Sequence, residues 1–135
     1  MTFFDLKGRE KKLKNARRYY INWHGKTRSK FQDAAKKFFY PYWANDLCME
    51  EMPLVGTLMK FDLVNISKKI VCEVMGGQHT KFNKHFHGTK NKFLGQIKRD
   101  LKKHEWCELN GFTLVEVYSE KELTYEYFLS QGVEL

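Results

Sequence analysis

Two β-rich runs joined by a short polar turn constrain the fold of this chain more than any other feature. Residues 57–64 read TLMKFDLV and residues 69–75 read KIVCEVM. Runs of this composition separated by a few polar residues are typical of a β-hairpin. If the turn is Ser67-Lys68 alone, the register places Asp62 directly opposite Glu73, with both side chains on one face and Cβ atoms about 5 Å apart.

Two carboxylates at that separation repel each other unless a positive charge lies between them. A hard divalent cation such as Mg²⁺ takes oxygen ligands and fits that position. The spacing leaves two alternatives open: both acids lie on a solvated face, or a longer turn gives a different register.

Helices are expected on both sides of the hairpin. Ser29 and Gln32 match a capping box, and Pro41 is expected to end the helix that follows. The apolar residues of that helix have helical spacing: Phe31, Ala34, Ala35 and Phe38. A helix is also expected over 93–109, where the residues predicted to face the core are Leu94, Ile97 and Leu101.

The remaining segments complete an α+β pattern. Residues 11–20 are interpreted as helical, residues 79–92 as a long polar loop, residues 112–118 as a buried strand and residues 123–129 as a closing helix. This order predicts an α/β (α+β) fold with a small mixed β-sheet flanked by helices. We expect a basic N-terminal arm over 1–25 and a single domain over 26–135.

The basic charge is concentrated near the N-terminus. The formal net charge is +8, and residues 1–40 hold twelve of the twenty-four Lys and Arg but only three acids. Such an excess favours a polyanion such as DNA, although an ordinary solvated basic surface gives the same pattern. The residues expected to contact nucleic acid are Arg17, Arg18, Lys26, Arg28, Lys30, Lys81, Lys84 and Lys90.

Other features point to an intracellular compartment. The three cysteines form no CxxC pair, which argues against a thiolate zinc site and a disulfide framework. We expect neither a membrane span nor a secretory signal, because no long apolar run is present.

Two further candidates follow the hairpin. His79 comes directly after Gly76-Gly77-Gln78, and glycines there would let its side chain return towards the strand end. Asp100 lies on a helix stripe with Gln96, Lys103 and Cys107, beside the predicted core face. Taken separately, His79 is as well explained by a structural or exposed position, and Asp100 by a helix salt bridge with Lys103 or His104.

The string FDLV…IVCEVMGGQH…FLGQIKRDLKKHEWCELNGFTLVEVYSE resembles the very-short-patch repair endonucleases. It is more similar still to the phage and bacterial nucleases and homing endonucleases described by an EDxHD motif, within the PD-(D/E)XK superfamily. The resemblance covers residues 57–120 and implies a restriction-endonuclease-like core.

Carried over by position, the resemblance implies an active centre. Asp62 would be a metal ligand, His79 a general acid/base or phosphate contact, and Asp100 the late aspartate. Glu73 matches the strand acid of the superfamily, and Lys103 belongs to the R-D-x-x-K helix motif.

The chain departs from the family pattern at two positions. The leading glutamate falls on Gln32, which would orient a metal-bound water or only cap the helix; Glu50 or Glu51 are the alternatives for the missing acid. The superfamily lysine falls on Met75, and in the hairpin register Lys60 lies opposite it and could supply the charge.

The implied function is hydrolysis of DNA phosphodiester bonds with Mg²⁺, for which Mn²⁺ would substitute, in the cytoplasm of a bacterial or phage-infected cell. A homodimer is left open. The alternatives are a non-catalytic DNA-binding module with a decayed nuclease fold, a junction resolvase, and an HNH-type nuclease built from His79, Asn83, His85 and His87.

Overall fold

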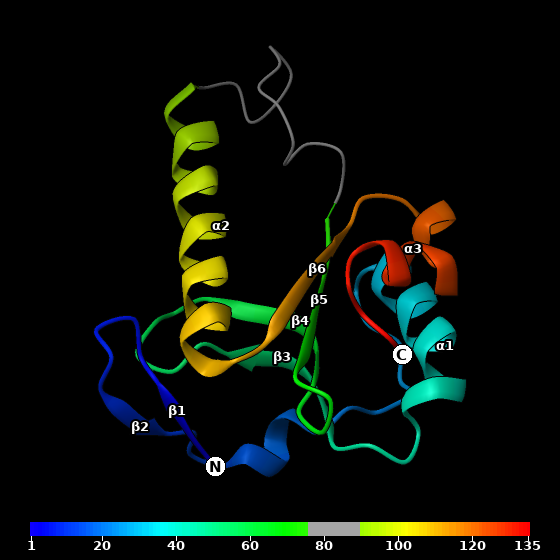
Figure 1. Ribbon diagram of the computed structural model, residues 1–135, viewed down its shortest axis with the longest axis horizontal. Coiled ribbons are helices and arrows are strands. Elements are labelled where there is room, and N and C mark those ends of the chain that lie inside the picture. Colours follow the sequence, from blue (N-terminus) through cyan, green and yellow to red (C-terminus); the bar gives the residue numbers. More distant parts are fainter. Residues whose placement is uncertain (76–89) are drawn as a thin grey trace.

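A four-stranded sheet forms the centre of the molecule (Figure 1). The computed structural model describes residues 1–75 and the backbone of residues 90–135, with side chains from residue 94 onward. The strands lie in the order β3 (Cys48–Pro53), β4 (Lys60–Asn65), β5 (Ile70–Val74) and β6 (Thr113–Val117). β3, β4 and β5 are antiparallel neighbours, whereas β5 and β6 are parallel. The predicted small mixed sheet is therefore present.

Helices cover the sheet on both faces. α2 (Lys90–Asn110) lies on one side, and α1 (Lys30–Trp43) lies with α3 (Tyr125–Ser130) on the other (Figure 1). Each side has its own apolar cluster, one including Trp106 of α2 and one including Phe39 of α1 and Phe128 of α3. Among the described residues, none of the helices has the length and apolar character that a membrane span requires.

The predicted register of the central hairpin is confirmed. Leu63 lies opposite Cys72 and Asn65 opposite Ile70, so the same register places Asp62 opposite Glu73. The turn is longer than the predicted pair, because the strands leave residues 66–69 between them. The Asn65 Oδ1 atom accepts a hydrogen bond from the Lys68 N–H at 2.8 Å, which closes the turn without changing the register.

The start of α1 is confirmed, but its predicted end is wrong. Ser29 Oγ accepts from the Gln32 N–H at 3.2 Å, as a helix cap does. The helix continues through Pro41 to Trp43, whose ring stacks on Phe39 with centroids 3.8 Å apart. Burial of Trp43 compensates for the loss of one backbone hydrogen bond, because a proline in the last turn has no N–H to donate.

The predicted core face of α2 is also wrong. Leu94, Ile97 and Leu101 are exposed, Leu101 to 57%, whereas Trp106 and Cys107 are buried. The reason is that the first turns of α2 extend past the sheet and only its last turns lie against it (Figure 1). Helical periodicity identified an apolar stripe, but not the part of the helix that meets the sheet.

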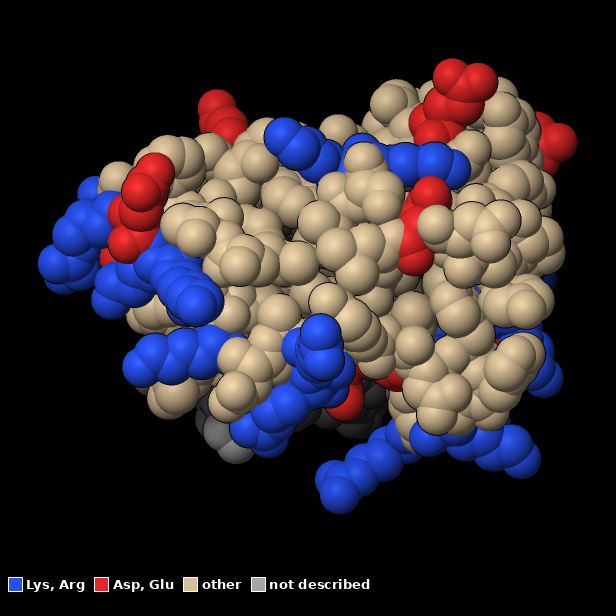
Figure 2. Space-filling model, turned by 90° about the horizontal axis from the view of Figure 1, so that it is seen from below, with Lys and Arg blue, Asp and Glu red and all other residues tan. Residues whose placement is uncertain are grey.

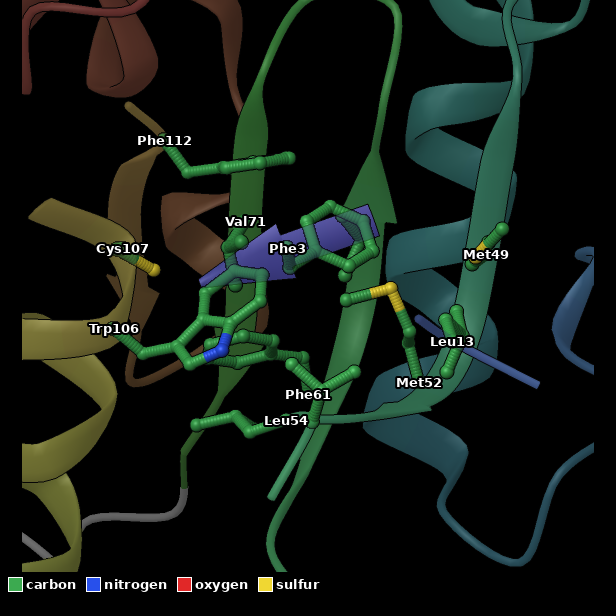
Figure 3. Close-up of a cluster of buried hydrophobic side chains, with 12 residues drawn as sticks. Phe3, Leu13, Met49, Met52, Leu54, Phe61, Val71, Trp106, Cys107 and Phe112 are labelled. Carbon is green, nitrogen blue, oxygen red and sulfur yellow. The ribbon is translucent and has the colours of Figure 1, made fainter. Parts of the chain in front are cut away.

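The first twenty residues differ from the helix expected there. β1 (Thr2–Phe4) pairs with β2 (Glu10–Lys12), and η1 (Ala16–Tyr19) is a short 3₁₀ helix. Phe3 and Leu13 are buried in the cluster around Trp106 (Figure 3). The apolar side chains of this basic segment are therefore part of the core.

Strand β3 was not expected from the sequence. Its residues, CMEEMP, contain two acids and a proline and no β-branched residue, so they lack the usual strand signals. β3 is an edge strand of the four-stranded sheet, a position where a proline and charged side chains are tolerated.

Candidate active site

Asp62 and Glu73 are held to each other's strand by two hydrogen bonds. The Asp62 N–H donates to Glu73 Oε2 at 2.8 Å, and the Val74 N–H donates to Asp62 Oδ2 at 2.8 Å. The regular pairing of β4 with β5 ends next to them, at Leu63 and Cys72. The two carboxylates therefore continue the strand pairing where the backbone ladder stops, and their positions are fixed by the sheet.

Lys103 of α2 reaches the same pair. Its ammonium group forms an ion pair with Glu73 Oε1, the oxygen that the Asp62 N–H leaves available. Glu73 is only 4% exposed. Burial, and after it the charge of Asp62, raise the pKa of Glu73, Lys103 opposes both, and the resulting pKa is about 8. The centre thus contains two acids whose repulsion is only partly compensated.

Cys107 lies one turn beyond Lys103 on the same helix. Burial, with the nearby charge of Glu73, raises the pKa of its thiol to about 12. A thiol with that pKa stays protonated at neutral pH, and Cys107 packs in the apolar cluster around Trp106.

A second acid lies beside Glu73 on β6. The parallel register places Glu116 opposite Glu73, and His104 Nε2 of α2 is 3.1 Å from Glu116 Oε1. Lys103 and His104 thus both pair with acids of the sheet. Asp100 nevertheless lies near this end of β6, because its charge contributes to the raised pKa of Tyr118, after burial and the larger effect of Glu116.

The Glu116–His104 pair was missed by the sequence reasoning. A signal was present, because Glu116 is the one acid within 112–118, the strand that was predicted to be buried. An acid at a position that faces a helix usually needs a partner from that helix.

The two alternatives for the helix acid that the resemblance implies, Glu50 and Glu51, have different surroundings. Glu50 is already engaged, because it accepts hydrogen bonds from the buried Lys36 ammonium at 3.0 Å and from the Asn22 N–H at 2.6 Å. Glu51 is exposed, and the pairs on either side of it in the β3–β4 register place it opposite Asp62.

Glu51 also has an unusual backbone conformation. Its φ of 51° is left-handed, in the middle of a strand. For a residue with a side chain this costs on the order of 1 kcal/mol or more, and such strain gathers at functional sites. Of the two alternatives, only Glu51 is exposed and lies in register with Asp62.

A cavity of about 680 Å³ lies at the N-terminal end of α1. Gln32 lines it and is 6% exposed, and its Nε2 has no hydrogen-bond partner among the described residues. Lys60 lines the same cavity. The other lining residues are Lys26, Thr27, Arg28, Ser29, Glu50 and Glu51.

Several of the predicted site residues are not placed by the structure at the centre formed by Asp62 and Glu73. His79, Lys81 and Lys84 lie outside the described residues, and so does the side chain of Lys90. Arg17 and Arg18 lie on η1, Lys26 and Arg28 lie in the segment before α1, and Lys30 is the first residue of α1. The structure thus brings together Asp62, Glu73 and Lys103, with Asp100 near the end of β6.

The two central acids, Asp62 and Glu73, can be compared with the ligands that Mg²⁺ takes in proteins. No group of three or more His, Cys, Asp or Glu in 1–75 and 94–135 is arranged to hold a metal ion. Mg²⁺ is often bound by one or two carboxylates together with water and substrate phosphates. Asp62 and Glu73 fit that donor set in kind and number.

Two viral proteins are similar to part of the chain. One is an uncharacterized protein, 307L, of Invertebrate iridescent virus 6, 39% identical over 71 residues, which are 51% of this chain and 36% of that protein. The other is an uncharacterized protein, 033L, of Invertebrate iridescent virus 3, 35% identical over 65 residues, which are 48% of this chain and 34% of that protein. The matches span about a third of the length of these relatives. No protein-family model and no solved structure matches the chain.

Proposed function

We propose that this chain is a metal-dependent DNA endonuclease whose centre is formed by Asp62, Glu73 and Lys103. The observation that carries the proposal is the pair of acids on adjacent strands, one of them 4% exposed, with a cation from α2 beside it. An acid with a pKa near 8 carries a large cost for its charge. A divalent cation bound to both carboxylates would offset that cost.

Asp62, Glu73 and Lys103 would have separate roles in phosphodiester hydrolysis. Asp62 and Glu73 would hold Mg²⁺ or Mn²⁺ through their carboxylate oxygens. When bound, such an ion polarises a phosphoryl oxygen and lowers the pKa of an attacking water. Lys103 would place a fixed positive charge beside the phosphate, where negative charge develops during the reaction.

Lys103 would also supply the cation that the superfamily pattern expects at position 75, where this chain has a methionine. The superfamily lysine is expected at that position on the strand, but Met75 is buried and its N–H bonds to the Val117 carbonyl. Lys103 reaches the strand acid from the facing helix instead. A cation is therefore available at the centre although the strand position lacks one.

His79 and Asp100 retain the roles that the family resemblance implies. His79 would transfer a proton to or from a reacting oxygen, and Asp100 would orient it or assist the metal. Glu51 would replace the helix glutamate of the family, because it lies opposite Asp62.

A DNA-binding module without catalysis is the second candidate. The observation that favours it is the ion pair of Lys103 with Glu73, because a metal ion must compete with that ammonium group for the carboxylate. Such a module would bind duplex DNA and would not nick it under any metal condition.

Plasmid nicking separates the two candidates. The purified chain is incubated with supercoiled plasmid and Mg²⁺, Mn²⁺ or EDTA, and we expect nicking that EDTA abolishes. Asp62→Asn should remove nicking while leaving DNA affinity equal or slightly higher, because it removes a metal ligand and a negative charge near phosphate.

The matched control is Glu105→Gln, which changes an exposed acid on α2 in the same way. It should nick like the wild type. Mg²⁺ should also raise the melting temperature of the wild type but not of Asp62→Asn, because a ligand that binds only the folded state stabilises it. Nicking by Asp62→Asn at the wild-type rate would remove this residue from the active centre.

A further inference from the structure

A basic groove lies between the N-terminal hairpin and α2. Its cavity measures about 490 Å³, and its walls come from the turn between β1 and β2 with Lys11 of β2, from the turn before β4 and from the middle of α2. Its described lining includes five cations: Lys7, Arg9, Lys11, Arg99 and Lys102. These positions differ from the basic residues that the sequence singled out for nucleic acid.

Asp5 is the one acid among the described residues of the lining, and its carboxylate is already used. Its Oδ1 accepts the N–H groups of Lys7 and Arg9, each at 2.9 Å, and Arg9 Nε lies 3.4 Å from Oδ2. The Arg9 N–H is the main cause of the lowered pKa of Asp5. Asp5 therefore shapes the turn between β1 and β2, and the groove keeps a strong positive excess.

Three of the cations are available to a ligand. Lys7, Arg99 and Lys102 are exposed and form no ion pair with an acid among the described residues. Seen from below, Lys and Arg side chains gather over the end of the molecule that carries the hairpin (Figure 2).

The hairpin side and the α2 side of the groove are both anchored in the core. Phe3 of β1 packs on Trp106 of α2 with ring centroids 5.2 Å apart (Figure 3). Gly56 lies so close to Asp5 that an added Cβ would be 3.2 Å from the Asp5 Cβ. The cations are thus presented on a fixed frame, which lowers the entropy cost of binding an extended ligand.

One apolar side chain of the groove favours nucleic acid over other polyanions as the ligand. Leu58, at the turn before β4, is 101% exposed and lines the groove among its cations. Sugars and base edges offer apolar surface next to phosphates, and apolar side chains of DNA-binding proteins use it. An acidic peptide or polyphosphate offers less of this combination.

We propose that this groove binds the sugar–phosphate backbone of duplex DNA, with Leu58 against a sugar or base edge. The inference rests on the proposed function, because it places DNA beside the candidate centre. Lys102 adjoins Lys103 in the chain, and Lys60 of the Gln32 cavity follows the groove residue Met59. The groove would hold the duplex on one side of the cut.

The test compares two charge-matched double variants of the full chain. Arg99→Gln with Lys102→Gln removes two groove cations, and Lys37→Gln with Lys121→Gln removes two exposed lysines on α1 and η3 (Glu120–Glu122). Affinity for a fluorescent duplex of about two helical turns of DNA is measured by anisotropy at several NaCl concentrations. The melting temperature of each variant confirms that it is folded.

We expect the groove variant to flatten the plot of log affinity against log salt by roughly 1.8, about 0.9 for each lost phosphate contact. Its dissociation constant at low salt should rise about tenfold or more. The control should match the wild type. Leu58→Ala should weaken binding but leave the slope unchanged, because it removes no charge.

The outcomes separate this inference from the proposed function. If the groove variant binds and nicks like the wild type, the groove is not the DNA site although the nuclease stands. If the slope flattens but no protein nicks DNA, the groove stands and the catalytic proposal fails. If polyglutamate displaces the duplex as well as unlabelled DNA does, the groove is a general polyanion surface and the assignment to DNA is overturned.

Discussion

At the residue scale, the effects of burial and of neighbouring charges are clearest at Glu73. It is buried, it lies next to Asp62, and the ammonium group of Lys103 contacts it. Its pKa near 8 is far above the ordinary value of 4.5. Between these two values the folded chain holds a proton that the unfolded chain has lost, so folding takes up a proton and the contribution of Glu73 to stability falls as pH rises.

Replacement of Glu73 by glutamine should therefore change how stability depends on pH. In EDTA, we expect the melting temperature of Glu73→Gln minus that of the wild type to increase from about pH 5 to about pH 8. The introduced amide does not titrate, whereas the wild-type carboxyl group loses its proton across that window. Thermal denaturation followed by circular dichroism at several pH values measures the difference, and parallel curves would contradict the raised pKa.

Mg²⁺ provides the internal control for this experiment. A metal ion bound to the ionised carboxylate should stabilise the wild type most at the higher pH values and should stabilise Glu73→Gln less. Glu108→Gln, at an exposed position on α2, should show the wild-type dependence on both pH and Mg²⁺.

At the element scale, α2 is divided into two functional parts. Its last turns bury Trp106 and Cys107 against the sheet and β1, and they carry Lys103 to Glu73. Its first turns extend past the sheet and expose Leu94, Ile97 and Leu101. The position of Lys103 therefore depends on how firmly the last turns are packed.

Two substitutions in α2 test this division. Trp106→Ala should lower the free energy of unfolding by about 3–5 kcal/mol, because the ring is fully buried among Phe3, Phe61 and Phe112. Leu101→Ala should cost less than about 0.5 kcal/mol, because its side chain is mostly exposed. Urea denaturation measures both, and a large loss for Leu101→Ala would show that this stripe is covered in solution.

At the scale of the whole molecule, the basic N-terminal segment is both a surface and a part of the core. Phe3 and Leu13 are buried with Trp106, and the Asn110 Oδ1 atom accepts from the Phe4 N–H at 2.7 Å. The charged residues of the same segment lie outside. Removing the segment would therefore alter folding as well as binding.

Deletion of residues 1–22 should abolish the cooperative unfolding transition. Loss of Phe3 and Leu13 from the core costs about 2–5 kcal/mol each, against a total stability of about 5–15 kcal/mol for a typical domain. Calorimetry measures the transition. An unchanged transition would show that the segment is an independent arm. The double substitution Arg17→Gln and Arg18→Gln, by contrast, should keep the melting temperature, since both side chains lie outside the core.

The sequence by itself determined the central part of the fold. The hairpin register was predicted from a short polar turn between 57–64 and 69–75, and the pairs Leu63–Cys72 and Asn65–Ile70 confirm it. Ser29 and Gln32 are close in the chain, so their cap follows from local geometry. The position of Asp62 opposite Glu73 is a consequence of the register and follows from the spacing of the two strands.

Only the tertiary structure decided which partners these residues meet. Lys103 is thirty positions from Glu73, and periodicity does not show which side of α2 meets the sheet. The missed strand β3, the buried Phe3 and the basic groove likewise depend on contacts between segments far apart in the chain. Local patterns specify elements, whereas burial against distant segments specifies which charges remain exposed and which acids need a cation.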